Sequence, residues 1–149
     1  YRRSIYSFWR RTVTPANMFD ASSRQVCRVT DTRNNTPLHA LTTLNDPTWV
    51  EASRLLAARV MERETQSVDQ LSLAFKSVTG RVPSEEEMQL LKGLYEKQFF
   101  IYQSDLEAAE AFLAVGETPT YGSLPLPSHA AMAATCLAIF NLDESLTRL

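Results

Sequence analysis

Glycine, cysteine and histidine are all scarce in this chain of 149 residues, and each shortage excludes a class of protein. Four glycines are too few for a β architecture built on many tight turns. Two cysteines, Cys27 and Cys136, cannot form a scaffold of several disulfides or a four-cysteine zinc site. They leave open one disulfide or two buried thiols, and we favour the thiols because Cys136 lies among small apolar residues.

Motifs that hold metals or phosphates are also missing. The only two histidines, His39 and His129, stand ninety residues apart, and no CxxC, HxxxH or calcium-loop pattern occurs. The chain has no glycine-rich phosphate loop. We therefore expect no metal site and no cofactor in this chain.

Long apolar runs are absent too, and only the N-terminal end carries a net positive charge. No run approaches the roughly 20 residues that cross a bilayer, so we expect no membrane insertion. Residues 1–33 carry seven arginines and two aspartates, a net charge of +5, whereas residues 34–149 carry eight basic and fifteen acidic groups, a net charge of −7. Because the acidic remainder opposes nucleic acid, we expect no nucleic-acid partner.

Residues 1–33 show no helical period and are rich in aromatic side chains, so we expect an extended, ordered arm. Such apolar surface is not stable in water, so the arm must lie on something. We expect Asp20 to Arg33 to pack on the helical body and Tyr1 to Arg11 to contact a surface outside this chain. The candidate interaction residues are Arg2, Arg3, Tyr6, Phe8, Trp9, Arg10, Arg11, Asp20, Arg24, Cys27 and Arg33.

The same arm holds the nearest approach to a catalytic group. The thiolate of Cys27 would be favoured by Arg24 and Arg28, with His39 or His129 as the base. The alternative, which we favour, is an arm pinned by arginine–carboxylate pairs with Cys27 buried.

Two helix starts of the same chemistry follow the arm. In Thr36-Pro37 and Asp46-Pro47 a capping residue precedes a proline, which suits the first helical turn. The second start predicts a helix to about Glu64. Its expected buried side is formed by Trp49, Ala52, Leu56 and Val60.

Later helices are expected to start at serines. Ser84 and Glu87 form a capping box, Ser104 and Glu107 repeat it, and Ser67 and Ser128 are further caps. The pattern predicts a single all-α domain over 1–149, a five- to six-helix bundle with a non-helical arm. Its parts are the arm (1–33), helices (34–115), a Pro/Gly loop (116–127) and a final helix (128–149).

An acidic motif lies near the end of the predicted final helix. Asp143 and Glu144 would oppose the helix dipole there, so we expect arginines of the arm to pair with them. The structural motif residues are Asn35, Thr36, Pro37, Asn45, Asp46, Pro47, Trp49, Asn141, Asp143 and Glu144.

Four patterns occur together in order along the chain: FDAxxRxxC from Phe19, NTPLxAL from Asn35, LNDPxxVEA from Leu44 and NLDE from Asn141. Together they resemble the planctomycete-type C-terminal domain of unknown function of large exported proteins, which often carry a cytochrome c-like domain. The resemblance implies a helical fold, a periplasmic or cell-envelope location, and haem in associated domains rather than here. It also implies that this chain is the C-terminal half of a larger domain.

The sequence leaves two functions open. The first is a non-catalytic helical docking module that binds its own upstream half or a partner subunit. The second is half of an enzyme, in carbohydrate or redox metabolism, whose cleft is shared with an upstream domain.

Overall fold

A computed structural model describes residues 37–119 and 124–146. These residues form seven helices and no strand, so the predicted all-α fold is confirmed. The helices are α1 (Pro37–Asn45), α2 (Pro47–Arg63), α3 (Ser67–Thr79), α4 (Glu85–Ser104), α5 (Leu106–Leu113), α6 (Leu126–Phe140) and α7 (Asp143–Leu146). The predicted arm lies outside the described residues.

Two of the predicted helix starts have the expected capping bonds. The Asp46 carboxylate accepts the Thr48 N–H at 2.8 Å, with Pro47 in the first turn of α2. Ser84 and Glu87 form the full capping box of α4: the Glu87 N–H donates to Ser84 Oγ at 3.2 Å and the Ser84 N–H to the Glu87 carboxylate at 2.7 Å. Each start is fixed by neighbours in sequence, which explains why the pattern predicted it.

The predicted capping role of Ser104 is wrong. Asp105 caps α5 instead, and its carboxylate accepts the Ala108 N–H at 2.9 Å. Ser104 is the last residue of α4, where its hydroxyl donates to the Ile101 carbonyl at 2.7 Å. An adjacent carboxylate is at least as good an acceptor at a helix start, so the cap falls one residue later.

The final helix also differs from the prediction, because it is divided. Helix α6 starts at Leu126 after Pro125, which places Ser128 inside its first turn, and it ends at Phe140. The acidic pair Asp143 and Glu144 begins α7, so both carboxylates lie at the favourable end of a helix.

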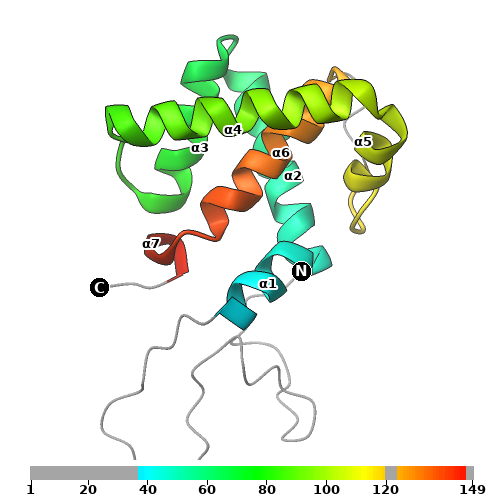
Figure 1. Ribbon diagram of the computed structural model, residues 1–149, viewed down its shortest axis with the longest axis horizontal. Coiled ribbons are helices and arrows are strands. Elements are labelled where there is room, and N and C mark those ends of the chain that lie inside the picture. The colour runs from blue at the N-terminus through cyan, green and yellow to red at the C-terminus, as the bar shows by residue number, and fades with distance from the viewer. Residues whose placement is uncertain (1–36, 120–123, 147–149) are drawn as a thin grey trace, which may run out of the picture.

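Helix α6 is the centre of the fold. It packs on α2, α4, α5 and α3, and Figure 1 shows α4 crossing over both α6 and α2. Ala130, Ala131 and Ala133 of α6 are fully buried, which permits close approach of its neighbours. The buried core consists of Ala57, Val60, Leu71, Ala74, Phe75, Leu91, Ala109, Leu113, Ala130, Met132, Ala133, Cys136 and Ile139.

Cys136 is a free thiol within this core. It is 0% exposed, and burial raises its pKa to about 12. Cys27 lies outside the described residues. Among those residues, none of the helices is both long and apolar enough to cross a bilayer.

Candidate functional site

Helix α2 buries only part of the side that its sequence predicts. Val60 is buried and Leu56 packs partly against the core, but Trp49 is half-buried and Ala52 is exposed, so the predicted placement of Ala52 on the inward side is wrong. The buried side also includes two charged residues, Glu51 and Arg54. A pattern of apolar side chains does not reveal this pair, because both members are charged.

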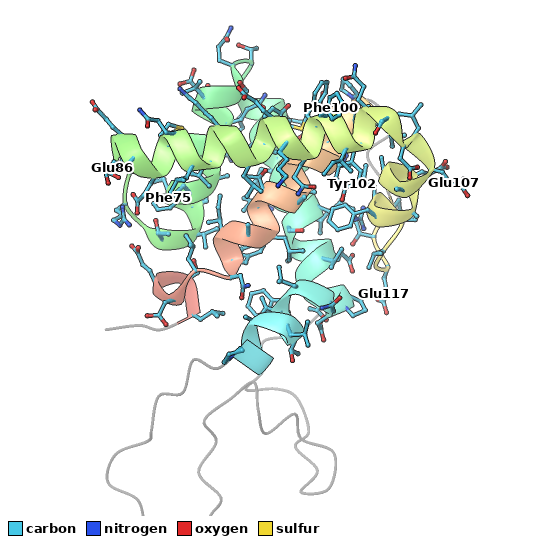
Figure 2. The ribbon with its side chains drawn as sticks, viewed as in Figure 1. Phe75, Glu86, Phe100, Tyr102, Glu107 and Glu117 are labelled. Atoms are coloured by element: carbon cyan, nitrogen blue, oxygen red, sulfur yellow. The ribbon has the colours of Figure 1, made fainter. Side chains whose placement is uncertain are left out.

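The Glu51 carboxylate holds the backbone of the loop after α5. It is 1% exposed and accepts the N–H of Glu117 at 3.1 Å and the N–H of Thr118 at 2.8 Å. Figure 2 shows Glu117 beside the start of α2, far from the end of α4 that carries Glu86. A buried carboxylate is tolerated when backbone donors satisfy it, as they do here.

The Arg54 guanidinium holds the same loop by its carbonyl groups. Its Nη2 donates to the Thr118 carbonyl at 2.7 Å and its Nη1 to the Pro119 carbonyl at 3.4 Å. The guanidinium also lies 3.7 Å from the Glu51 carboxylate. Arg54 is 0% exposed, and its Nε atom has no hydrogen-bond partner. We refer to Glu51, Arg54 and loop 116–119 as the buried clamp.

His129 of α6 closes the inner side of the buried clamp. Its Nε2 lies 3.1 Å from the Arg54 carbonyl oxygen. A carbonyl only accepts, so the imidazole carries its proton on Nε2 and donates this bond. Burial, with the nearby Arg54 charge, lowers the pKa of His129 below its usual value, so the ring is neutral at pH 7.

Gly116 allows the loop to come this close to α2. Its φ is +107°, and a Cβ added there would lie against the Glu51 side chain at contact distances of 2.5 and 2.7 Å. A larger residue would have to displace the carboxylate. The buried clamp therefore fastens the loop to α2. Within the described residues its two charged side chains are 1% and 0% exposed, so they are not open to a substrate.

The opposite side of α2 lines an open groove with a volume of about 530 Å³. Trp49 packs edge-on against Phe140 across the groove, with ring centroids 5.8 Å apart and planes at 64°. Among the described residues that line it, Arg59 is the one that carries a charge. The groove is lined by Trp49, Ala52, Leu55, Leu56 and Arg59 of α2, Ser77 and Val78 of α3, and Phe140 and Ser145.

Helix α4 has apolar side chains on two opposite sides. Met88, Tyr95 and Tyr102, spaced seven residues apart, pack on the core. The other side leaves large apolar side chains in solvent, and Figure 2 shows Phe100 on the outer surface of the helix. This outer face consists of Leu90 (75% exposed), Phe100 (73%) and Ile101 (43%), with Leu106 (53%) at the start of α5.

Glu144 of the acidic motif is paired with a residue of the described helices. The Arg81 guanidinium binds Glu144 at 2.7 Å and Glu87 at 2.6 Å. It also lies 4.9 Å from the centroid of the Phe75 ring. The Arg81 hydrogen bond lowers the pKa of Glu87 to about 2. Pairing of Glu144 with the arm stays a prediction, since the arm is outside the described residues.

Some of the remaining predicted site residues lie in the described helices, and the others lie outside the described residues. Pro37 starts α1, and the Asn45 amide at its end donates to the Leu41 carbonyl at 2.7 Å. Asn141 follows α6, and its side-chain oxygen is buried without a partner. Outside the described residues lie Arg2, Arg3, Tyr6, Phe8, Trp9, Arg10, Arg11, Asp20, Arg24, Cys27, Arg33, Asn35 and Thr36. Within the described ranges, no three His, Cys, Asp or Glu side chains converge as metal ligands.

A family model described as PSD1, a protein of unknown function (DUF1553), matches residues 1–95, and the chain therefore belongs to this family. No curated protein and no solved structure matches the chain. The matched residues include Glu51, Arg54 and most of the groove lining. Loop 116–119, His129 and Phe140 lie beyond the match.

Proposed function

We propose that this member of the PSD1 family is a non-catalytic docking module of an exported, multidomain, cytochrome-associated protein. Its docking surface is the outer face of α4 and α5. The partner is a folded domain, either the upstream half of the same polypeptide or a subunit bound to it. Export and the association with haem-bearing domains rest on the sequence resemblance alone.

The outer face of α4 is the observation that carries this proposal. Leu90 and Phe100 are each about three-quarters exposed, although the opposite side of the same helix already packs on the core. On a helix these positions, with Ile101, lie toward one side, with the exposed Gly93 and Lys97 between Leu90 and Phe100. Exposed apolar side chains gathered on one side of a helix are typical of helix-packing interfaces.

The charges of the described helices favour binding over chemistry. A general acid or base must reach its substrate within hydrogen-bond distance. Glu51 and Arg54 are 1% and 0% exposed, and loop 116–119 covers them. Their bonds to that loop support a stabilising role.

A photo-cross-linking experiment on the complete polypeptide, purified from its source organism, tests the proposal. A benzophenone amino acid at Phe100 should cross-link to one defined site in an upstream domain or stoichiometric subunit. The matched control places the same group at Lys76, an exposed position on α3, and should give no cross-link to that site. Absence of a defined product from Phe100, or cross-linking only to a second copy, would overturn the proposal.

A further inference from the structure

The groove beside Trp49 is a second unfilled apolar surface, and it lies on α2 rather than on α4. Its walls come from α2, α3, the end of α6 and Ser145 of α7, so folding builds it as a unit. A volume of about 530 Å³ lies within the range of roughly 300–1,000 Å³ that holds compact ligands. Two large apolar side chains fit such a space.

Charges at the groove rim differ from one wall to the other. Arg59 is exposed on the α2 wall. The opposite wall includes Ser145 of α7, and Glu144 of that helix is already bound by Arg81. A segment suited to this groove therefore has apolar side chains and an acidic group for Arg59.

The chain itself supplies such a segment before α1. Met18 and Phe19 are adjacent, Asp20 follows them directly, and Arg24 lies four residues later. The aromatic residues nearer the N-terminus are instead flanked by arginine pairs, which Arg59 would repel.

The chain length also permits this segment to reach the groove. Helix α1 begins at Pro37 and packs against α2 and α6, which both line the groove. The thirteen residues from Arg24 to Pro37 span up to about 45 Å when extended. The net charges of +5 for residues 1–33 and −7 for the remainder favour the approach.

We propose that residues 18–24 bind in this groove, with Met18 and Phe19 against Trp49 and Phe140 and with Asp20 facing Arg59. The N-terminal segment then acts as an intramolecular ligand of the helical domain. The groove is distinct from the outer face of α4. A failure of this inference would therefore leave the proposed function unchanged, and the reverse also holds.

A fluorescence experiment on the full chain tests the inference. Replacing Trp9 by Phe leaves Trp49 as the single tryptophan of the two. A nitroxide quencher is then attached to Cys27, three residues after Arg24. Cys136 should not react, because it is 0% exposed and its pKa is raised to about 12. We expect labelling to lower the Trp49 emission at least twofold, independently of protein concentration.

Exchanging the charges of Asp20 and Arg59 shows whether these two residues form the proposed contact. Arg59→Asp should restore most of the emission, and the double variant Asp20→Arg/Arg59→Asp should be quenched again. Arg63→Asp, an exposed arginine on the same helix that does not line the groove, should leave the quenching unchanged. Phe19→Ser should also restore emission without altering any groove residue.

Three results would overturn the inference. Emission that is insensitive to the label places residues 18–24 away from the groove. Quenching that rises with protein concentration assigns the groove to a second copy. Equal effects of Arg59→Asp and Arg63→Asp show a general charge effect and no specific pair. Circular dichroism of each variant identifies any that fail to fold, and Phe19→Ser then provides the decisive measurement.

Discussion

The two sides of α2 do not separate by polarity alone, because the buried side mixes apolar residues such as Val50 and Val60 with charged ones. The side that faces the protein holds Glu51 and Arg54 at 1% and 0% exposure. The side that faces solvent holds Trp49, Leu55 and Leu56, which line an open groove. One helix thus buries an ion pair and leaves an aromatic ring half-covered.

Which side chains of α2 are buried therefore depends on the hydrogen-bond and packing partners around the helix, and polarity alone does not decide it. Glu51 and Arg54 are buried because loop 116–119 offers two N–H donors and two carbonyl acceptors to them. Trp49 has only the edge of Phe140 beside it among the described aromatic residues. Substitutions on the buried side and on the groove side of α2 should therefore lower the free energy of unfolding by unequal amounts.

The largest expected effect is on the buried side. Arg54→Ala removes the donors to Thr118 and Pro119 and leaves the Glu51 charge buried beside an empty volume. We expect the free energy of unfolding to fall by about 3–5 kcal/mol, measured by urea denaturation. Arg63→Ala, on the exposed part of the same helix, should change it by less than about 0.5 kcal/mol. A loss below about 1 kcal/mol for Arg54→Ala would show that the clamp contributes little.

The second effect concerns the close approach of the loop. Gly116→Ala combines a positive φ with a clash against the Glu51 side chain, so we expect a loss of about 2–3 kcal/mol. Gly80→Ala is the matched control, since its φ is +85° but nothing lies within 4 Å of the added Cβ. That variant should cost about 1 kcal/mol from the backbone alone. Equal losses would mean that the carboxylate moves aside freely.

The third effect is on the open side. Trp49→Ala removes a half-buried ring that packs on Phe140, and we expect a loss of about 1–2 kcal/mol. Phe75→Ala, at a position 1% exposed, should cost about 3–5 kcal/mol. Thermal unfolding of both variants compares them directly. A loss at Trp49 that approaches the loss at Phe75 would show that more than Phe140 covers the ring, as the proposed binding of residues 18–24 implies.

The smallest effect depends on pH. The folded protein holds His129 neutral with a lowered pKa, whereas the unfolded chain binds a proton near the ordinary pKa of about 6.5. The unfolded state therefore binds more protons below pH 6.5, so this contribution is present above that pH and is lost as pH falls toward the folded pKa. The slope is at most about 1.4 kcal/mol per pH unit.

Urea denaturation between pH 5.5 and 7.5 measures this slope. His129→Gln keeps a donor for the Arg54 carbonyl and cannot titrate, so its stability should change less with pH. An unchanged slope in that variant would assign the pH dependence to other groups.

Local signals in the sequence predicted much of the helical framework. Asp46 and Ser84 cap α2 and α4 as expected because each bonds to residues two or three positions away. The outer face of α4 carries apolar residues in the sequence as well, yet the regular spacing of Met88, Tyr95 and Tyr102 identifies the side that packs on the core.

The buried clamp was beyond prediction for a related reason. Glu51 and Arg54 contact residues more than sixty positions away in a Pro/Gly loop, and no local pattern encodes such a contact. A signal did exist, because the opposite charges stand three residues apart among the small residues Ser53, Ala57 and Ala58. A solvated pair is seldom surrounded by so many small side chains.

The central position of α6 determines when the protein can fold during synthesis. Helices α2 to α4 are complete by residue 104, but α6, which covers them, ends only at Phe140. At about 5–20 residues per second, the ribosome needs several seconds to add the missing segment. The family match ends at residue 95, so the matched part alone leaves the emerging chain with an uncovered core. Nascent chains of this protein should therefore remain chaperone substrates until α6 has been made.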